Sequence, residues 1–427
     1  MKEELLHFIW KYKKLQLEDL VTSKNEPILI EDVGTHNHLA GPDFFNAKVR
    51  IDDQLWAGNI EIHIKSSDWF AHNHEQDPNY DNVILHVVWE DDMEVFRSDN
   101  SEIPTLELKT FIAPGILKSY QDLFDKKHKS FINCESRIGQ IDAFVLENWL
   151  ERLYFERLER KSVQIETLLK DSKNDWEQVL FSSLLKNFGL KVNGEAFVSL
   201  AQAVDYSIVR KLRNGRPLLE SLFFGMSHLL ESNDVVDEYY LNLQNEFHYL
   251  IKKFELNPDR VLKPAFFKLR PHNFPTIRLA QLASLYHSKQ NLFAEIVAAS
   301  ILEALYNTLD VSASSYWDTH FNFGKESKKS IKRTTRKFID LLIVNTILPI
   351  KFAYAKHMGK DAGEEIVGII SQISEEHNSI VQKFEQFGLD LKSAKESQSV
   401  LQLYNEYCTQ NKCLQCAVGN RILKGKD

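Results

Sequence analysis

Hydrophobic and polar residues follow two different periods along this chain, and the change of period divides it into two parts. Apolar residues recur at helical spacing over residues 1–12, which predicts a first helix. From Pro27 onward, short runs rich in β-branched and aromatic residues indicate strands. These runs cover 28–30, 44–51, 55–64 and 83–89, and a further hairpin is expected over 94–109. Beyond about residue 112, strand signals nearly vanish.

The second part of the chain is predicted to be helical. A long helix is expected over 142–169, and another begins after Asp175, a favourable N-cap residue, and ends at Gly189. Helical periodicity recurs over 195–204, 214–231, 236–254, 275–288, 292–309, 328–356, 361–387 and 393–407. We therefore expect the fold class α+β. An N-terminal mixed-sheet domain, residues 1–125, should precede a larger all-α domain, residues 126–427.

Composition and charge narrow the class of protein only a little. Hydrophobic residues make up 43% and charged residues 26% of the chain, which excludes intrinsic disorder and collagen-like structure. The net charge of −8 is mild, so contact with nucleic acid would need a local basic patch. The start of the chain lacks the apolar run of a signal peptide. Charged residues interrupt the apolar stretch 338–355, so we expect a cytoplasmic protein that does not enter membranes; its oligomeric state is left open.

Residues of catalytic and metal-ligating types crowd into the predicted strands. Six of the 15 histidines fall between residues 36 and 86, namely His36, His38, His63, His72, His74 and His86. Side chains alternate between the two faces of a strand, so Glu61, His63 and Lys65 share one face. Such a row is typical of either a solvated face or the rim of an active site. The apolar strand around His86 favours a central sheet and therefore the second interpretation.

A predicted hairpin brings a second acid toward this row. If the strands 44–51 and 55–64 turn at 52–54, Asp43 lies beside Ile62 with a two-residue loop, or beside His63 with a three-residue loop. In either register Asp43 is near Glu61. Paired carboxylates bind Mg²⁺ or Mn²⁺, and a bound ion polarises a phosphodiester and helps to generate hydroxide.

These considerations define a candidate site. Asp43 and Glu61 are expected to bind the divalent metal, and His63 or Lys65 is expected to stabilise charge or to move a proton. Because imidazole suits transition metals, additional histidine ligands would shift the preference toward Mn²⁺ or Zn²⁺. The candidates for additional ligands are His72, His74 and His86.

The cysteines suggest a separate metal site. Cys408, Cys413 and Cys416 form a C-x4-C-x2-C array near the C-terminus, a pattern typical of thiolate ligands. A closed zinc or iron–sulfur site needs a fourth ligand, and Cys134 is the one cysteine left. We therefore expect the four thiols to converge on a zinc ion or an iron–sulfur cluster. The alternative is a set of reduced, partly buried thiols.

Two polar segments are candidates for contact with nucleic acid. Residues 325–337 hold seven basic side chains against one acid; the candidate phosphate ligands are Lys328, Lys329, Lys332, Arg333 and Arg336. A loop at 269–275 leads into a predicted helix and contributes Arg270 and, beyond it, Arg278, which suit an anion at a helix N-terminus. The competing interpretations are a solvated helix start for the first segment and a structural brace for the second.

The chain resembles, over nearly its whole length, an uncharacterised bacterial family catalogued as a domain of unknown function. The resemblance implies no activity. The stretches that carry it are Gly41-Pro42-Asp43-Phe44, Glu61-Ile62-His63, Asp68-Trp69 with His72 and His74, Val83 to Val88, Leu269-Arg270-Pro271 with Asn273 and Pro275, and the terminal cysteines.

Residues 1–90 also resemble the PD-(D/E)xK nuclease superfamily. The shared features are the order helix, strand, strand opening with Pro-Asp, strand with Glu-x-Lys, helix, strand. The resemblance implies that Asp43 is the first acid and Glu61 the second. His63 stands where that family has lysine, and Lys65 lies one step further on the same strand face.

The function we expect is that of a metal-dependent phosphodiesterase or nuclease acting on DNA or RNA. The alternative is a non-catalytic nucleic-acid-binding or scaffolding protein with structural histidines and a cysteine metal site. Convergence of Asp43, Glu61 and His63 on one place would favour the enzyme.

Overall fold

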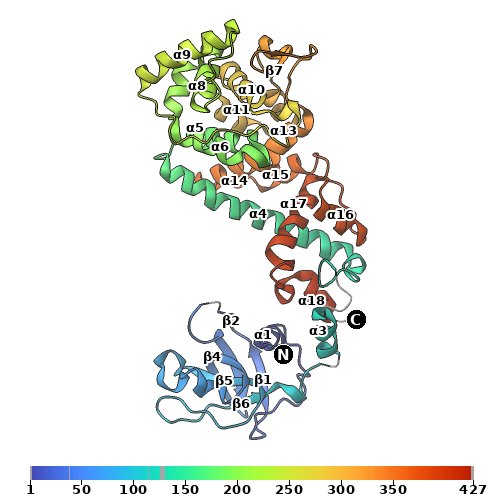
Figure 1. Cartoon of the computed structure of the whole chain (residues 1–427). Coiled ribbons are helices and arrows are strands. Elements are labelled where there is room, and N and C mark those ends of the chain that lie inside the picture. The colour runs from blue at the N-terminus through green and yellow to red at the C-terminus, as the bar shows by residue number, and fades with distance from the viewer. Residues whose placement is uncertain (1, 38, 114, 126–129, 425–427) are drawn as a thin grey trace. The chain divides into compact units, whose positions relative to one another are not determined.

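The chain forms a mixed sheet near its N-terminus and a larger helical region after it, the α+β class that the sequence predicts (Figure 1). The structure is a computed structural model that describes residues 2–37, 39–113, 115–125 and 130–424. His38, one of the clustered histidines, lies outside the described residues.

The chain divides into two compact units. The first consists of Met1–Trp149, Phe387–Leu389 and Tyr404–Asp427, and the second of Leu150–Gln386 and Asp390–Leu403. The boundary expected from the sequence, between residues 125 and 126, lies inside the first of these units. The C-terminal segment belongs to the first unit, in which helix α18 (Ala417–Lys424) packs against helix α3 (Ile116–Phe124).

The sheet has six strands within the described residues, in the order β1-β3-β4-β5-β6, with β2 paired to β3. Strand β3 is antiparallel to β1 and β4, whereas β4 and β5 are parallel, as are β5 and β6. The hairpin predicted over 94–109 is confirmed only around its turn. Phe96 and Glu102 form an antiparallel bridge, and the N–H groups of Arg97 and Ile103 donate to the carbonyls of Ser101 and Val95. Beyond this turn the chain pairs in parallel with β5 as β6. The strands are β1 (Ile28–Asp32), β2 (Thr35–His36), β3 (Phe44–Ile51), β4 (Gln54–Lys65), β5 (Val83–Glu90) and β6 (Thr105–Glu107).

Two helices pack on the central strand β4. Helix α1 (Glu3–Lys11) is amphipathic and buries Leu5, Leu6, Ile9 and Trp10 completely. Helix α2 (Asp68–Ala71) follows β4 directly and buries Trp69, whose indole N–H donates to the carbonyl of Phe96. Residues 60–63 of β4 are all buried, so both faces of the sheet are covered at this point.

A bulge fixes the register of the hairpin near the acids. Ala47 pairs with Gly58, as a two-residue loop requires, but Phe44 pairs with Ile60, one position out of that register. Asn46 lies in the bulge with a φ of 58°, a left-handed conformation that asparagine adopts more readily than most residues. Continuing the shifted register places Asp43 opposite Glu61 rather than opposite Ile62 or His63, and so both predicted registers are wrong by this shift.

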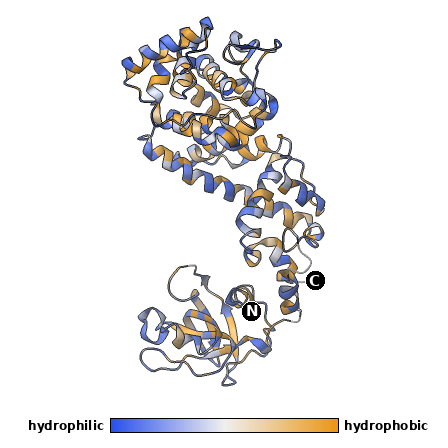
Figure 2. Ribbon diagram, viewed as in Figure 1, coloured by the Kyte–Doolittle hydropathy of each residue, from blue (hydrophilic) through white to orange (hydrophobic). Residues whose placement is uncertain are grey.

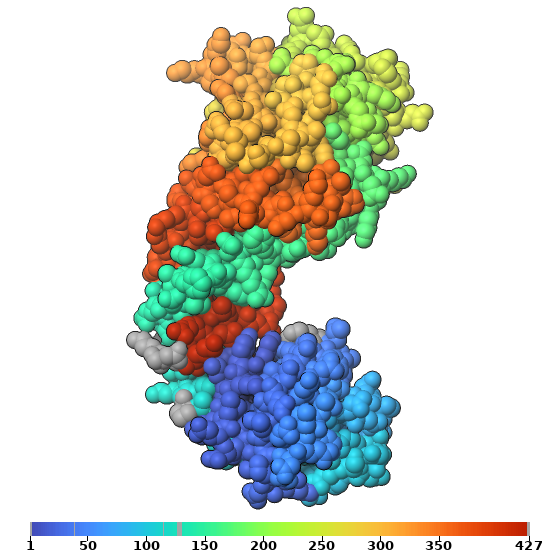
Figure 3. All heavy atoms as spheres, turned by 180° about the vertical axis from the view of Figure 1, so that it is seen from behind, coloured from blue at the N-terminus to red at the C-terminus, as the bar shows by residue number. Residues whose placement is uncertain are grey.

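The helical region is built around α10 (Pro275–Ser288), whose residues 275–286 are all buried. Its other helices are α4 (Ala143–Asp171), α5 (Trp176–Phe188), α6 (Leu190–Ala203), α7 (Tyr206–Leu212), α8 (Arg216–Met226), α9 (Glu238–Phe254), α11 (Leu292–Ala298), α12 (Leu302–Leu309), α13 (Arg336–Leu342), α14 (Leu348–His357), α15 (Gly363–Ile370), α16 (Ser379–Gln386) and α17 (Ala394–Leu403). Helix α4 lies beside the chain's C-terminal third, to which Arg160 donates a hydrogen bond at Gln402 (Figure 3).

The structure corrects several features of the helical prediction. The stretches expected over 292–309 and 361–387 are each divided between two helices, α11 with α12 and α15 with α16. The helix expected over 328–356 begins only at Arg336, because Thr335 caps it by accepting a hydrogen bond from the N–H of Phe338. The residues before it form a short ribbon of β7 (His320–Asn322) and β8 (Lys325–Glu326). A β-ribbon in this part of the chain has no counterpart in the prediction.

The segment Arg336–His357 is long and apolar enough to cross a membrane by length and composition, and 67% of its most apolar stretch is buried inside the structure. It consists of α13, a π-helical turn at Ile343–Ile347, and α14. Hydrophobic residues colour much of the surrounding helical body (Figure 2). The segment therefore packs as a core helix, as predicted for 338–355.

Replacement of Gly58 by alanine tests how tightly β4 and β5 pack. A Cβ at this position would lie 2.4 Å from Ile84 Cγ2 and 2.6 Å from the carbonyl oxygen of Asn82. We expect Gly58→Ala to destabilise the protein by about 1–3 kcal/mol, measured by thermal unfolding. Gly368→Ala is the control, because a methyl group there meets open space and α15 should gain about 0.5–1 kcal/mol. Equal midpoints for both variants would contradict close packing at Gly58.

Candidate metal centre

Four elements between residues 54 and 90 bring four histidines together beside the sheet. His63 lies on β4 and His86 at the centre of β5. His72 ends helix α2, and His74 begins the 3-10 turn that follows. Asn73, between them, has a left-handed φ of 60°, so the chain turns sharply there. The turn allows both flanking imidazoles to face His63.

The donor atoms of these residues lie at the spacing of metal ligands. His63 Nε2 is 3.1 Å from His72 Nδ1, and single ring nitrogens of His63, His72 and His74 lie within 4.8 Å of one another. Glu61 Oε1 is 3.5 Å from His63 Nε2 and 3.4 Å from His74 Nε2. Ligands about 2.0–2.1 Å from a tetrahedral ion are separated from one another by about 3.3–3.4 Å. Three imidazoles and one carboxylate therefore fit a single ion.

Burial keeps the central histidines in the form that a ligand needs. Burial lowers the pKa of His63 to about 2, with further lowering by His86, His74 and His72. Burial likewise lowers the pKa of His86 to about 3. Both rings are therefore neutral at physiological pH, and a neutral imidazole is the ligating species.

The hydrogen bond between His63 and His86 determines the tautomers. His63 Nδ1 is 2.8 Å from His86 Nε2. If His63 presents an unprotonated Nε2 to a metal, its proton is on Nδ1 and is donated to His86. His86 thus orients a ligand from behind, as is common for metal-bound histidine. This is a different role from the direct metal ligand that we predicted for His86.

Each of the two predicted acids accepts a backbone hydrogen bond, Glu61 from Asp43 itself and Asp43 from the residue after Glu61. The N–H of Asp43 donates to Glu61 Oε2 over 3.1 Å, and the N–H of Ile62 donates to Asp43 Oδ2 over 3.0 Å. Burial, reinforced by the Asp43 charge, raises the pKa of Glu61 to about 9. Without a metal ion, Glu61 therefore retains its proton at neutral pH.

The structure adds neighbours that the sequence analysis did not select. His7, on α1, has its Nε2 3.2 Å from Asp43 Oδ2. Burial opposes protonation of His7, but the hydrogen bond and charge of Asp43, with Glu3 and Glu61, raise its pKa overall. Tyr80 stacks on His74 with ring centroids 3.8 Å apart. The spacing of residues 3–11 indicated the helix, but no local signal showed that its His7 side faces the acids.

None of the described contacts joins Lys65 to the acids and histidines of this site. Its Nζ lies 3.8 Å from Asp92 Oδ2, and the side chain is half exposed. Asp43, Glu61, His63, His72, His74 and His86 are therefore brought together, whereas Lys65 points to a different acid.

The basic segment at 325–337 is mostly engaged in internal contacts. Lys332 is buried, and its Nζ donates to the carbonyl oxygens of Asp318 and Ser330. Arg333 pairs with Asp310, and Arg336 pairs with Glu303. Of the candidate phosphate ligands in this segment, only Lys328 and Lys329 remain as exposed lysines not occupied in this way.

The polar segment at 269–275 is held by contacts with Arg278 inside the protein. Arg278 is buried, donates to Asn273 Oδ1 and Gln281 Oε1, and lies over the ring of Phe338 at 3.5 Å. Arg270 is exposed at the start of a 3-10 turn. The brace interpretation therefore describes the position of Arg278 in the structure.

The four cysteines lie in one neighbourhood of the first unit. Burial raises the pKa of the Cys408 thiol, and the nearby Cys134, Cys416 and Cys413 raise it further. Asn133 Nδ2 donates to Cys413 Sγ over 3.3 Å. Burial raises the pKa of Cys416 to about 11, although the backbone N–H groups of Gly419 and Val418 oppose this shift.

Gly419 shows how closely the terminal helix approaches this cluster. A Cβ on Gly419 would lie 2.0 Å from the carbonyl oxygen of Cys413. The N–H of Cys416 donates to the same carbonyl. The start of α18 is therefore folded tightly against the Cys413–Cys416 turn.

The chain belongs to the family described as Protein of unknown function (DUF2851), whose model matches residues 3–379. Neither a curated protein nor a solved structure matches the chain. The resemblance of residues 1–90 to the PD-(D/E)xK nucleases therefore stays a prediction.

The raised pKa of Glu61 predicts the pH dependence of stability in the metal-free protein. Between the ordinary glutamate pKa of 4.5 and the folded value of about 9, the folded state holds a proton that the unfolded chain has released. This stability is complete below the lower value and is lost as the pH rises through the upper one. We expect the thermal midpoint to fall less from about pH 7 to about pH 9 in Glu61→Gln than in the original protein.

The lowered pKa values of His63 and His86 keep these two histidines from titrating in that pH range. Their folded pKa values of about 2 and 3 lie below the ordinary 6.5, so their contribution is already complete above about pH 7. Glu18→Gln, at an exposed position, is the matched control. Parallel pH profiles for Glu61→Gln and the original protein would show that the Glu61 proton is not retained.

Proposed function

For this member of a family without an assigned activity, we propose metal-dependent hydrolysis of phosphodiesters in nucleic acid. The observation that carries the proposal is the convergence of three imidazole nitrogens and the Glu61 carboxylate on one point. Burial of a carboxylic acid beside neutral imidazoles is costly for stability alone. A bound cation would ionise Glu61 and satisfy all four donors at once.

The donor set favours Mn²⁺ or Zn²⁺ over Mg²⁺. Magnesium ions take oxygen ligands and keep several waters, whereas imidazole suits transition metals. His63, His72 and His74 would hold the ion together with Glu61, and Asp43 would orient Glu61 through its backbone N–H. When bound, the ion would lower the pKa of a coordinated water and polarise a phosphoryl oxygen.

Asp43 and His7 are placed to handle protons. Asp43 is 22% and His7 18% exposed at the side chain, whereas His63 is only 2% exposed. The Asp43 carboxylate can accept a proton from a water at the open edge, and His7 can share that proton through their 3.2 Å contact. His72 is exposed as well, so this edge is where a substrate would approach.

The case for nucleic acid as the substrate rests on two features. Asp43 precedes β3 and Glu61 lies on β4, which are the places that the PD-(D/E)xK pattern gives its two acids. The exposed Lys328 and Lys329 supply positive charge for phosphate contact in the second unit.

We also propose that Cys134, Cys408, Cys413 and Cys416 bind a structural zinc ion or an iron–sulfur cluster. Their mutual electrostatic influence and the burial of Cys134 and Cys416 support this proposal. Ordinary thiols gain nothing from crowding, whereas thiolates around a metal ion are stabilised by it. Such a site would tie the C-terminal segment to the turn that contains Cys134.

The first experiment measures Mn²⁺-dependent cleavage of labelled single-stranded DNA, double-stranded DNA and RNA. We expect Glu61→Gln and Asp43→Asn to lose about 100-fold or more of the rate, because each removes a charge but keeps the side-chain shape. Asp53→Asn, in the exposed turn at the other end of the β3–β4 hairpin, should keep full activity. Mass spectrometry of metals should show less bound ion in His63→Ala and His74→Ala.

Full cleavage by both acid variants would exclude Asp43 and Glu61 from the chemistry. Metal binding without cleavage of any of the three substrates would reject the nuclease. Binding of nucleic acid by such an inactive protein would favour the alternative, a non-catalytic nucleic-acid-binding protein.

The second experiment removes the thiolate site. Because metal binding adds to the free energy of folding, Cys413→Ser should lose the bound metal and unfold at a lower temperature. Chelation of the original protein should have the same effect. Thr409→Ser, an exposed neighbour, is the control. Unchanged metal content and midpoint in Cys413→Ser would identify these residues as plain thiols.

A further inference from the structure

A cavity of about 580 Å³ lies among helices of the second unit. Its walls come from α4, α5, α6, the π-helical turn Ile343–Ile347 and the start of α14. Cavities of about 300–1,000 Å³ are the usual size for small-molecule sites. The cavity is therefore large enough for a small organic molecule.

The charges in its wall are all of one sign. Arg157, Lys161 and Lys186 line the cavity, and none of its described lining residues is an aspartate or a glutamate. Arg157 and Lys161 are four residues apart on α4, where two like charges repel. Lys161 Nζ donates to neutral acceptors, Asn345 Oδ1 at 3.0 Å and the Asn345 carbonyl at 3.4 Å.

Most of the charged groups that act on Lys161 are also positive. Burial lowers its pKa well below the ordinary value, and the charges of Arg157, Arg160 and Lys186 lower it further. Glu376 acts in the opposite direction, but it is not part of the cavity wall. A largely buried cation among other cations destabilises the protein unless an anion joins them.

The backbone around Asn345 is opened by a local irregularity. Pro349 lacks the N–H that would reach the Asn345 carbonyl four residues earlier, and the helix widens to a π turn at this point. Lys161 donates to that carbonyl instead. Asn187 Nδ2 donates to Thr346 Oγ1 over 2.8 Å, which holds the other wall of the turn in place.

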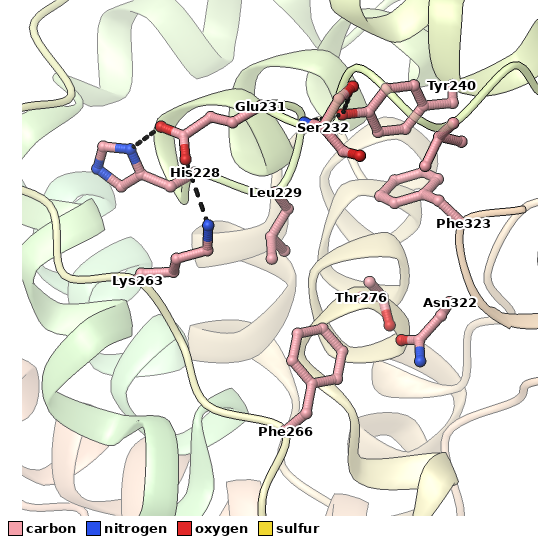
Figure 4. Close-up of a pocket in the computed structure, with 11 residues that line it drawn as sticks. His228, Leu229, Glu231, Ser232, Tyr240, Lys263, Phe266, Thr276, Asn322 and Phe323 are labelled. Carbon is pink, nitrogen blue, oxygen red and sulfur yellow. Dashed lines mark hydrogen bonds and ion pairs between the residues drawn. The ribbon is translucent and has the colours of Figure 1, made fainter.

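A second cavity in the same unit shows the opposite arrangement (Figure 4). It measures about 260 Å³, and one acid lies beside its basic side chains. Glu231 lies 2.6 Å from His228 Nδ1 and 3.3 Å from Lys263 Nζ. The fold therefore neutralises cations with an acid beside one cavity, but not in the wall of the larger one.

We propose that the larger cavity binds a small organic phosphate. Its phosphate group would contact Arg157, Lys161 and Lys186, since guanidinium and ammonium donors suit phosphate oxygens. Its organic part would lie against the apolar side of the wall, formed by Ile165, Leu168 and Val198. This site belongs to the second unit alone and does not depend on the metal centre.

Calorimetric titration of the full chain with AMP at fixed ionic strength tests this proposal. We expect saturable binding that is tighter than that of inorganic phosphate, and no binding of adenosine, which lacks the charge. Lys161→Met should weaken AMP binding by about tenfold or more, since a hydrogen bond to a charged group is lost. Lys170→Met, on the exposed face of the same helix, is the matched control and should bind AMP like the original protein.

Lys186→Met is a second variant at a more exposed position of the wall, and it should also weaken binding. It keeps the test decisive if Lys161→Met does not fold. Absence of saturable AMP binding to the original protein would overturn the proposal. Unchanged AMP affinity in folded Lys161→Met or Lys186→Met would overturn it equally.

Discussion

The N-terminal unit depends on one unusual interaction, the burial of the Glu61 carboxyl group against the ring nitrogens of His63 and His74. Glu61 is on the central strand β4 and is buried. Burial raises the pKa of the acid and lowers that of the imidazoles, so each group loses its charge. A cation bound at their meeting point, as we propose, would ionise the acid and would be compatible with the neutral rings.

The geometry of that interaction is set by small departures from regular structure. The bulge at Asn46 moves Asp43 into line with Glu61, and the left-handed Asn73 turns His74 back toward β4. His86 contributes from the next strand through His63. The two backbone features place the residues of the site, and the contact of His86 adds a hydrogen bond between side chains.

In the helical unit, the main question is how basic side chains are compensated. Its basic residues are mostly satisfied inside the unit, as the contacts of Lys332 and Arg278 show. The wall of the larger cavity differs, because Arg157 and Lys161 share one side of α4 there and no acid is among its described residues. In the one place the cations brace the fold, and in the other they leave unbalanced charge at a cavity. Basic side chains therefore have different roles in two parts of the same unit.

The sequence by itself determined the α+β class, most helices, and the strands that carry Glu61, His63 and His86, because these depend on local periodicity. It also selected five of the gathered residues besides Asp43, since side-chain alternation and spacing are local properties. Only the tertiary structure decided the register of Asp43, the approach of His7 from α1, and the separation of Lys65 from the group. These outcomes depend on a bulge and on packing between distant segments, which local patterns do not encode.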